Sequence, residues 1–202
     1  VLPRGAQPER VRRMDRLSAL VVVVALVGCE SKQDKPLPGR ADTTKVAQKA
    51  VSTEAFCDVQ FPGTTGPKFT VPPLVGGTIA ASAPTWRWIN VWATWCKPCV
   101  NELPRLARWR EQLGGKYELA FISVDENEED LDAFRKAHPE APASPRLADP
   151  DKQGDWYVSL GLDAGAPVPI HIFVEPGGHV RCARAGGVRE QDYPAIQKLL
   201  SE

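Results

Sequence analysis

The sequence predicts an α/β fold in which buried strands alternate with amphipathic helices. Short apolar runs rich in aromatic and β-branched residues recur along the chain, and such runs are typical of strands covered on both faces. Between them lie segments whose apolar residues return every three to four positions, which is the period of a helix with one buried face. The clearest example is the stretch from Trp86 to Leu106, where a strand, two cysteines and a helix follow one another.

The two cysteines of this stretch lie at the predicted strand-to-helix turn, in the sequence Cys96-Lys97-Pro98-Cys99. An apolar run containing Ile89, Val91 and Trp92 precedes the turn and predicts a buried strand. The helix after the turn ends at the Gly114-Gly115 pair, because glycine readily adopts the left-handed C-cap conformation. Its apolar residues at helical spacing are Leu103, Leu106, Trp109 and Leu113.

A helix N-terminus has a chemical effect on the first cysteine. Free backbone N–H groups and the helix dipole favour negative charge there, so Cys96 is stabilised as a thiolate, and Lys97 adds a cation beside it. A thiolate is the species that attacks a disulfide. Cys99 lies one turn further on and can reach disulfide distance from Cys96, so the pair can cycle between dithiol and disulfide.

Two other interpretations of this cysteine pair are a half zinc site and a purely structural disulfide. Structural zinc needs four ligands, usually from a second close pair. The other cysteines, Cys29, Cys57 and Cys182, are isolated from one another in the sequence and make no such pair. We therefore interpret Cys96 and Cys99 as a redox pair and expect no metal and no cofactor.

The residues WATWCKPC followed by NELP resemble the active site of the TlpA/ResA-like thiol-disulfide oxidoreductases, a branch of the thioredoxin superfamily. The resemblance covers residues 69 to 200. It implies a thioredoxin-like fold: a central mixed sheet flanked by helices, with an N-terminal hairpin extension and a helix-containing insertion. It also implies that Cys96 is the nucleophile, that Cys99 is the resolving thiol and that Trp95 flanks them as an apolar platform.

The resemblance also assigns Glu102, which stands three residues after Cys99, where ResA-like members carry an acid near the active site. Asn90 stands where thioredoxins have a buried aspartate, so proton handling would pass to Glu102. The alternative is that Glu102 is an ordinary exposed acid of the first helical turn, favoured by the helix dipole.

A second active-site element is expected in residues 167–175, where Pro169 precedes an apolar strand. In the resembling family a cis-proline at this place packs beside the cysteines, and Val168 would present its backbone for strand-like hydrogen bonding to a substrate. The alternative is a trans proline that only starts a strand. His171 is expected to lie in or beside the sheet rather than to bind a metal.

The rest of the domain is predicted from the same patterns. The acidic run 125–130 is interpreted as a solvated helix start rather than a metal site. Gly76 and Gly77 weakly mark the turn of the short N-terminal hairpin. The remaining expected elements are strands at 55–61, 69–74, 119–125, 147–149 and 179–185, helices at 126–137 and 156–160, and a final helix whose buried stripe is Tyr193, Ile196, Leu199 and Leu200.

The N-terminal residues 1–28 are predicted to be a lipoprotein signal peptide. Four arginines (Arg10, Arg12, Arg13 and Arg16) lead into the apolar run 17–27, which at about 11 residues is too short to span a bilayer. The run ends at a Gly28-Cys29 step that resembles a lipobox, which makes Cys29 the lipidated residue. A conventionally cleaved signal peptide with an incidental cysteine is the alternative.

Residues 29–53 are polar and have few large apolar groups, so we expect a flexible tether there, followed by one domain at 54–202. The whole chain has no net charge. Residues 1–28 hold five of its 25 basic and two of its 25 acidic residues, so the remainder has a net charge of −3. Nothing in this balance suggests nucleic acid as a partner.

Cys57 and Cys182 are expected to form a structural disulfide, because leftover cysteines of proteins outside the cytoplasm tend to be paired. The pair would join the N-terminal extension to the last strand.

The predicted function is that of a monomeric, lipid-anchored thiol-disulfide oxidoreductase in the bacterial cell envelope, facing the periplasm. By resemblance it would act as a reductant of protein substrates, for example apocytochrome c thiols, and would receive electrons from a membrane protein of the DsbD/CcdA type. A disulfide donor is the first alternative.

Two further functional classes have motifs that differ from the one found here. A Sco-like copper-binding assembly protein usually has Cys-x-x-x-Cys and a histidine, whereas here the cysteine spacing is one residue shorter and His171 is the candidate ligand. A thiol peroxidase would need Pro-x-x-x-Thr-x-x-Cys, but Ile89 and Ala93 occupy the proline and threonine positions.

Overall fold

The structure is a computed structural model, and it describes residues 51–201. The predicted signal peptide (1–28), the predicted lipidation site Cys29 and most of the predicted tether (29–53) lie outside the described residues. Thr53 already belongs to a helix, and the Val51 N–H donates to the Gln191 carbonyl at 3.5 Å, so the folded part begins slightly before residue 54. Among the described residues, no helix has the length and apolar character needed to cross a bilayer.

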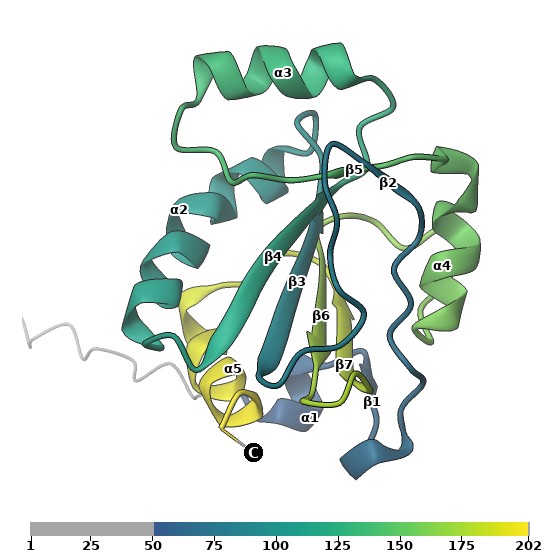
Figure 1. The fold of residues 1–202 in the computed structure, drawn as a ribbon. Helices are drawn as coiled ribbons and strands as arrows, with labels where there is room; N and C mark the ends of the chain where they lie inside the picture. The colour runs from purple at the N-terminus through teal and green to yellow at the C-terminus, as the bar shows by residue number, and fades with distance from the viewer. Residues whose placement is uncertain (1–50, 202) are drawn as a thin grey trace, which may run out of the picture. The chain divides into compact units, whose positions relative to one another are not determined.

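The described residues form a mixed sheet with helices on both faces (Figure 1). In chain order the elements are α1 (Thr53–Phe56), β1 (Val59–Gln60), η1 (Gly63–Thr65), β2 (Leu74–Val75), β3 (Trp86–Trp92), α2 (Lys97–Gln112), β4 (Tyr117–Ser123), α3 (Glu128–Ala137), β5 (Arg146–Leu147), η2 (Pro150–Lys152), α4 (Gln153–Ser159), β6 (Ile170–Val174), β7 (Val180–Ala185), η3 (Glu190–Asp192) and α5 (Tyr193–Leu199).

The strand order is β1-β7-β6-β3-β4-β5-β2, with β3 near the centre. Strand β3 runs parallel to β4 and antiparallel to β6, while β7 and β1 complete one edge in antiparallel fashion. Every residue of β3 is buried, which fits a strand covered on both faces. This is the thioredoxin-like mixed sheet that the sequence predicts, with α3 as the helix of the expected insertion.

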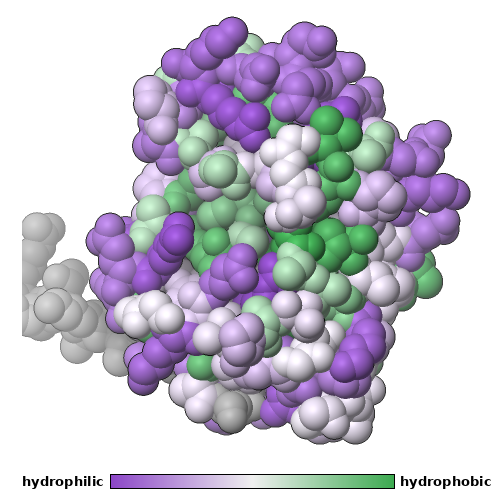
Figure 2. Space-filling view, viewed as in Figure 1, coloured by the Kyte–Doolittle hydropathy of each residue, from purple (hydrophilic) through white to green (hydrophobic). Residues whose placement is uncertain are grey.

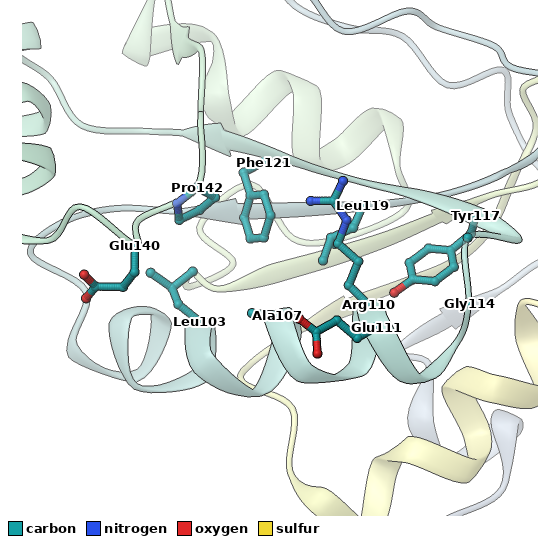
Figure 3. Close-up of a pocket in the computed structure, with 11 residues that line it drawn as sticks. Leu103, Ala107, Arg110, Glu111, Gly114, Tyr117, Leu119, Phe121, Glu140 and Pro142 are labelled. Carbon is teal, nitrogen blue, oxygen red and sulfur yellow. The ribbon is translucent and has the colours of Figure 1, made fainter.

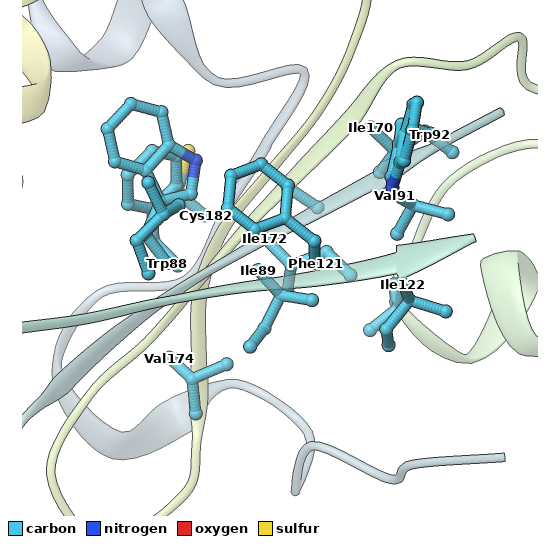
Figure 4. Close-up of a cluster of buried hydrophobic side chains, with 14 of the residues drawn as sticks. Trp88, Ile89, Val91, Trp92, Phe121, Ile122, Ile170, Ile172, Val174 and Cys182 are labelled. Carbon is cyan, nitrogen blue, oxygen red and sulfur yellow. The ribbon is translucent and has the colours of Figure 1, made fainter. Parts of the chain in front are cut away.

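The core lies on the faces of β3, β4 and β6, whose side chains interdigitate in Figure 4. Trp88 and Phe173 stack with ring centroids 5.2 Å apart, and Trp109 of α2 stacks on Trp88 at 6.3 Å. Tyr193 of α5 packs against Trp109, so α2 and α5 cover the same face of the sheet. Figure 1 shows α4 on the opposite side. Burying each of these large side chains contributes about 1.5–3 kcal/mol.

The N-terminal extension departs from the expected hairpin. Strand β2 lies directly before Gly76 and Gly77, the expected turn, but it pairs with β5. The next strand along the chain is β3, and both of its edges are occupied by β4 and β6, so β2 and β3 cannot form the hairpin.

The expected strand at 55–61 is also wrong in its first half, where the structure has helix α1. The Ser52 side chain accepts a hydrogen bond from the Ala55 N–H at 3.2 Å, an N-cap that favours helix. Phe56 is fully buried and meets Phe173 edge to face at 5.8 Å. Only Val59 and Gln60 pair as strand.

Candidate active site

Cys96 and Cys99 lie where β3 gives way to α2, as the sequence predicts. Cys96 is the N-cap of α2 in extended conformation, and Pro98 occupies the first turn, where a missing N–H does no harm. The two sulfurs form a disulfide of 2.01 Å, with 5.2 Å between the Cα atoms. Cys99 is fully buried, whereas Cys96 keeps 4% of its surface exposed. Cys96 is thus the one cysteine of the pair that retains exposed surface.

The helix N-terminus faces the Cys96 sulfur. The Cys99 N–H donates to the Cys96 Sγ atom at 3.3 Å, and the Val100 N–H donates to the Cys96 carbonyl at 3.0 Å. Lys97 is exposed on the same turn. The Cys99 N–H group and the helix dipole would stabilise negative charge on the Cys96 sulfur once the disulfide is reduced.

Val168 and Pro169 lie beside the cysteines, although about 70 positions separate them in the chain. The Val168–Pro169 peptide bond is cis. The Cys96 sulfur lies 3.5 Å from the Val168 carbonyl oxygen, and the Pro169 carbonyl accepts from the Gly186 N–H at 2.8 Å. The segment before β6 thus forms one wall of the site.

Trp95 is 68% exposed directly before Cys96, an unusual position for so large an apolar side chain. Together with half-buried Val168 it offers apolar surface on either side of the Cys96 sulfur. This arrangement suits contact with a protein substrate, because exposed aromatic side chains are common anchors in protein interfaces.

The loop before Cys96 is held by Asp125, a role that the sequence did not reveal. The Thr94 N–H donates to both Asp125 carboxylate oxygens at 3.1 Å, and the Thr94 hydroxyl donates to Oδ1 at 2.6 Å. The Ser123 hydroxyl donates to Oδ2 at 2.6 Å. Asp125 is only 1% exposed, so the interpretation of 125–130 as a solvated run is wrong at its first residue.

Glu102 is buried beneath the active-site turn, with 2% of its surface exposed, and is not the exposed acid of the alternative interpretation. Its Oε1 atom accepts from the Asn90 side-chain amide at 2.9 Å, and its Oε2 atom accepts from the Val188 N–H at 2.9 Å. Residues 99 and 102 are three apart on α2, so their side chains share one face of the helix. The structure thus brings Glu102 to the same buried side as Cys99, while its role in proton transfer stays a prediction.

His171 lies inside the sheet, as expected, and is fully buried. Its Nδ1 atom accepts a hydrogen bond from the Trp88 indole N–H at 3.1 Å, and its Nε2 atom lies 3.4 Å from Glu102 Oε1. Both ring nitrogens therefore face partners other than the cysteines. In the described part of the chain, no group of three or more His, Cys, Asp and Glu residues is placed to hold a metal ion.

Cys57 and Cys182 form the second disulfide, with 5.6 Å between the Cα atoms. It joins the residue after α1 to the middle of β7, across 125 positions of sequence. Cys182 is fully buried in the core next to β6, so solvent does not reach this half of the disulfide.

A groove runs along α2 on the side away from α5. Figure 3 shows Leu103 and Ala107 of α2 facing Leu119 and Phe121 of β4, with Pro142 closing one end, around a cavity of about 610 Å³. The hydropathy view shows apolar surface below α3 (Figure 2), where a second cavity of about 460 Å³ is lined by Val100 of α2 and Phe134 of α3. Burial raises the pKa of Tyr117, on the rim of the groove, to about 12. Neither Cys96 nor Cys99 lines the groove.

The fold is thioredoxin-like, and its site holds a Cys-x-x-Cys pair that can cycle between dithiol and disulfide. The chain belongs to the AhpC/TSA family, whose model matches residues 62–183. The positions of the peroxidase motif are filled by core residues of this chain, since Ile89 and Ala93 are both fully buried.

Individual relatives agree with this assignment. A Bacillus subtilis protein described as thioredoxin-like protein YneN is 35% identical over 49 residues, a match that covers 23% of this chain and 29% of that protein. The matched part is thus less than a third of that relative's length.

Two solved structures share the fold. One, from Chlorobium tepidum and described as a candidate thiol:disulfide interchange protein DsbE, has a TM-score of 0.51 at 18% identity and covers 67% of this chain and 94% of its own. The other is a thioredoxin-like protein in the oxidised form. It has a TM-score of 0.50 at 15% identity, and the match covers 67% of this chain and 95% of that protein. At these identities the likeness concerns the fold, and it confirms the predicted thioredoxin-like architecture.

Proposed function

We propose that this protein exchanges disulfides with protein substrates through Cys96 and Cys99, acting as a reductant while anchored in the bacterial cell envelope. The observation that carries the proposal is the asymmetry of the pair: Cys96 retains a little exposed surface at a helix N-terminus, whereas Cys99 is fully buried one turn away. Such an arrangement separates the attacking thiol from the resolving thiol.

The reaction balances as two exchanges. The Cys96 thiolate attacks one sulfur of a substrate disulfide, whose S–S bond breaks and whose other cysteine leaves as a thiolate. The Cys99 thiol then loses its proton and attacks the Cys96 sulfur, which releases the second substrate thiolate and leaves the Cys96–Cys99 disulfide. Two electrons have passed to the substrate, so a dithiol donor must reduce the pair again. We propose a membrane protein of the DsbD/CcdA type as that donor and apocytochrome c thiols as one target.

The proposed location rests on two features. The sequence before Glu30 has the basic residues, apolar run and cysteine of a lipoprotein signal, so we propose that Cys29 carries lipid and that 29–53 tethers the domain. The Cys57–Cys182 disulfide supports a site outside the cytoplasm, because structural disulfides persist in oxidising compartments. Residues 54–202 would then face the periplasm as a monomer.

The copper-binding alternative gains no support from the site. A Cu(I) site would need a His171 ring nitrogen beside the two sulfurs, but those nitrogens face Trp88 and Glu102. The disulfide-donor alternative uses the same chemistry in reverse and is separated by the reduction potential of the pair.

Substrate trapping tests the proposal. The full chain with Cys99→Ser, expressed in a bacterium, should accumulate mixed disulfides through Cys96 that thiol reduction releases. The matched variant Cys96→Ser should trap nothing, because Cys99 is buried. Equal trapping by both variants, or none by either, would refute the proposed exchange. Fractionation of Cys29→Ser tests the anchor separately: the protein should move from the membrane fraction to the soluble fraction.

A further inference from the structure

A buried polar cluster lies under the active-site turn, at the meeting of β3, β6 and α2. Its members are Asn90 of β3, Glu102 of α2 and His171 of β6, and each is at most 2% exposed. Asn90 and His171 are directly paired in the register of β3 and β6, so their side chains share the face that α2 covers. Buried polar groups need hydrogen-bond partners inside the protein. Here Asn90 donates to Glu102, and Trp88 and the Val188 backbone supply further hydrogen bonds to His171 and Glu102.

The contacts of His171 fix its tautomer. The Trp88 indole N–H can only donate, so the His171 Nδ1 atom, 3.1 Å away, must be the acceptor. The proton of the neutral ring is therefore on Nε2. That atom lies 3.4 Å from Glu102 Oε1 and makes no hydrogen bond with any of residues 51–201. The Glu102 carboxyl group is therefore the charged group nearest to the ring Nε2 atom, within reach of a small adjustment of either side chain.

The Glu102 carboxyl group is held on both oxygens. Asn90 donates to Oε1 and the Val188 N–H donates to Oε2, both at 2.9 Å. The Gly187 position has no side chain, and a Cβ atom there would lie 3.2 Å from Oε2 and 3.8 Å from Pro169 Cγ. The carboxyl group is therefore located between the active-site helix and the segment that carries Pro169.

The other charged groups around His171 are directed elsewhere. Arg184 of β7 opposes His171 in the sheet register, but its guanidinium group donates to the Phe56 carbonyl of α1 and lies 4.8 Å from the Phe56 ring centroid. Tyr117 of β4 packs against Trp88, and Asp192 of η3 accepts from the Arg189 N–H at 2.7 Å. Glu102 is the titratable group that His171 faces.

We propose that His171 is a positioning residue for Glu102 in proton transfer at Cys99. This inference rests on the proposed disulfide exchange and deepens it. When Cys99 resolves the mixed disulfide, its S–H bond breaks and the proton passes to the Glu102 carboxylate. The freed electron pair forms the bond to the Cys96 sulfur, and the substrate cysteine leaves as a thiolate. The His171 N–H group would orient the carboxylate before the transfer, and the proton taken from Cys99 stays on the Glu102 carboxyl group.

The test follows each chemical step with 2,2′-dithiodipyridine, an uncharged disulfide. Attack by Cys96 on this reagent releases one pyridine-2-thione, and resolution by Cys99 releases a second, so the two steps appear as two phases. The variants are His171→Leu, which removes both ring nitrogens, and His171→Gln, which keeps a side-chain N–H donor. His138→Gln is the matched surface control, because His138 is exposed and stacks on Phe134.

In His171→Leu we expect the rate of the second phase to fall about tenfold at pH 7 and the pH profile of that phase to shift. A positioned proton acceptor typically accelerates a reaction by about 10²- to 10⁴-fold, and the loss of His171 should remove only part of this acceleration. The first phase should stay at the wild-type rate, and His171→Gln should recover part of the second. Glu102→Gln and the double variant with His171→Leu should be equally slow, because both residues act through one carboxyl group.

A second phase in His171→Leu with the wild-type rate and pH profile would overturn the inference, and so would additive effects in the double variant. If the wild-type protein itself releases only one pyridine-2-thione, the proposed exchange fails instead. Should His171→Leu not fold, the ¹⁵N spectrum of the wild-type ring decides the question: we expect a protonated Nε2 and shifts that respond to reduction of Cys96–Cys99. A protonated Nδ1, or no response to reduction, would refute the inference.

Discussion

The sulfur of Cys96 lies 3.5 Å from the carbonyl oxygen of Val168, so the accessible cysteine and the segment before β6 form one surface. A substrate cysteine joined to Cys96 would lie against the Val168 backbone, where extended chains can add strand-like hydrogen bonds. This relationship makes the Val168 side chain a sensitive place to change the environment of the sulfur.

Replacement of Val168 by glutamate should slow attack by Cys96. The new carboxylate would repel the neighbouring thiolate, so the first phase of pyridine-2-thione release should slow several-fold at low salt and recover at high salt. Val168→Gln is the matched control for size and should keep the wild-type rate. Equal rates in the two variants at low salt would show that Val168 does not border the reacting sulfur.

Asp125 should prove essential for holding the loop before Cys96. Its carboxylate accepts from the N–H and hydroxyl groups of Thr94 and from the Ser123 hydroxyl, and buried hydrogen bonds to a charged group contribute about 1.5–3 kcal/mol each. Urea unfolding of the oxidised protein should show Asp125→Asn to be destabilised by at least that amount. Thr94→Val, which removes one of these bonds, should be less affected. A larger loss of stability in Thr94→Val than in Asp125→Asn would contradict the proposed role of Asp125 in holding the loop.

The Cys57–Cys182 disulfide should stabilise the fold without taking part in the exchange. It closes a loop of 125 positions, for which the chain-entropy model gives about 4–5 kcal/mol. Cys57→Ser with Cys182→Ser should lower the free energy of unfolding by roughly this amount, while both phases of the exchange remain. Thiol labelling of Cys96→Ser with Cys99→Ser offers an independent check, since two free thiols without reduction would show that the disulfide does not form.

The ion pairs of Glu190 should make a small, pH-dependent contribution to stability. Hydrogen bonds from Arg108 and Arg105 of α2 hold the pKa of Glu190 below its usual range. A lowered pKa in the folded state stabilises the protein above the unfolded pKa of about 4.5, and this contribution is lost as the pH falls through the folded value. Because the side chain is 58% exposed, the effect should be under about 1 kcal/mol.

The measurement is urea unfolding of Glu190→Gln between pH 3 and pH 7. The variant should be less stable than the wild type at pH 7 and equal to it near pH 3. Glu129→Gln, on the exposed face of α3, serves as the control. A difference in unfolding free energy between the variant and the wild type that grows as the pH falls would contradict the prediction.

Substitution of Gly187 by alanine should disturb Glu102 directly. The added Cβ atom would lie 3.2 Å from Glu102 Oε2, so the carboxyl group must move by a few tenths of an ångström. We expect the second phase of the exchange to slow several-fold while the first phase is unchanged. Gly165→Ala is the control, because a Cβ atom there meets nothing within 4 Å. A normal second phase in Gly187→Ala would argue against a role for the exact position of Glu102.

Local patterns predicted the parts of the fold that depend on local chemistry. The apolar run before Cys96 became β3, the helical spacing after it became α2, and Leu131 of the helix expected at 126–137 is fully buried. The thioredoxin-like sheet followed from the resemblance of residues around Cys96 rather than from composition. These elements are set by periodicity and by capping, which a sequence displays directly.

The parts that were missed depend on tertiary pairing. No pattern around Leu74 shows that β4 and β6 occupy both edges of β3, so the hairpin prediction failed. Asp125 looks like the first residue of an acidic run, and only its approach to Thr94 makes it a buried acceptor. The meeting of His171 and Glu102 depends on the register of β6 against β3, which no residue pattern encodes.

The most direct test of the central claim is the reduction potential of the Cys96–Cys99 pair in the full protein, equilibrated with glutathione or dithiothreitol buffers and read by tryptophan fluorescence. A reductant is expected to show a single two-electron transition at about −220 mV or below, in the thioredoxin-to-glutaredoxin range. A transition near about −120 mV, the range of strong disulfide donors, would contradict the reducing role.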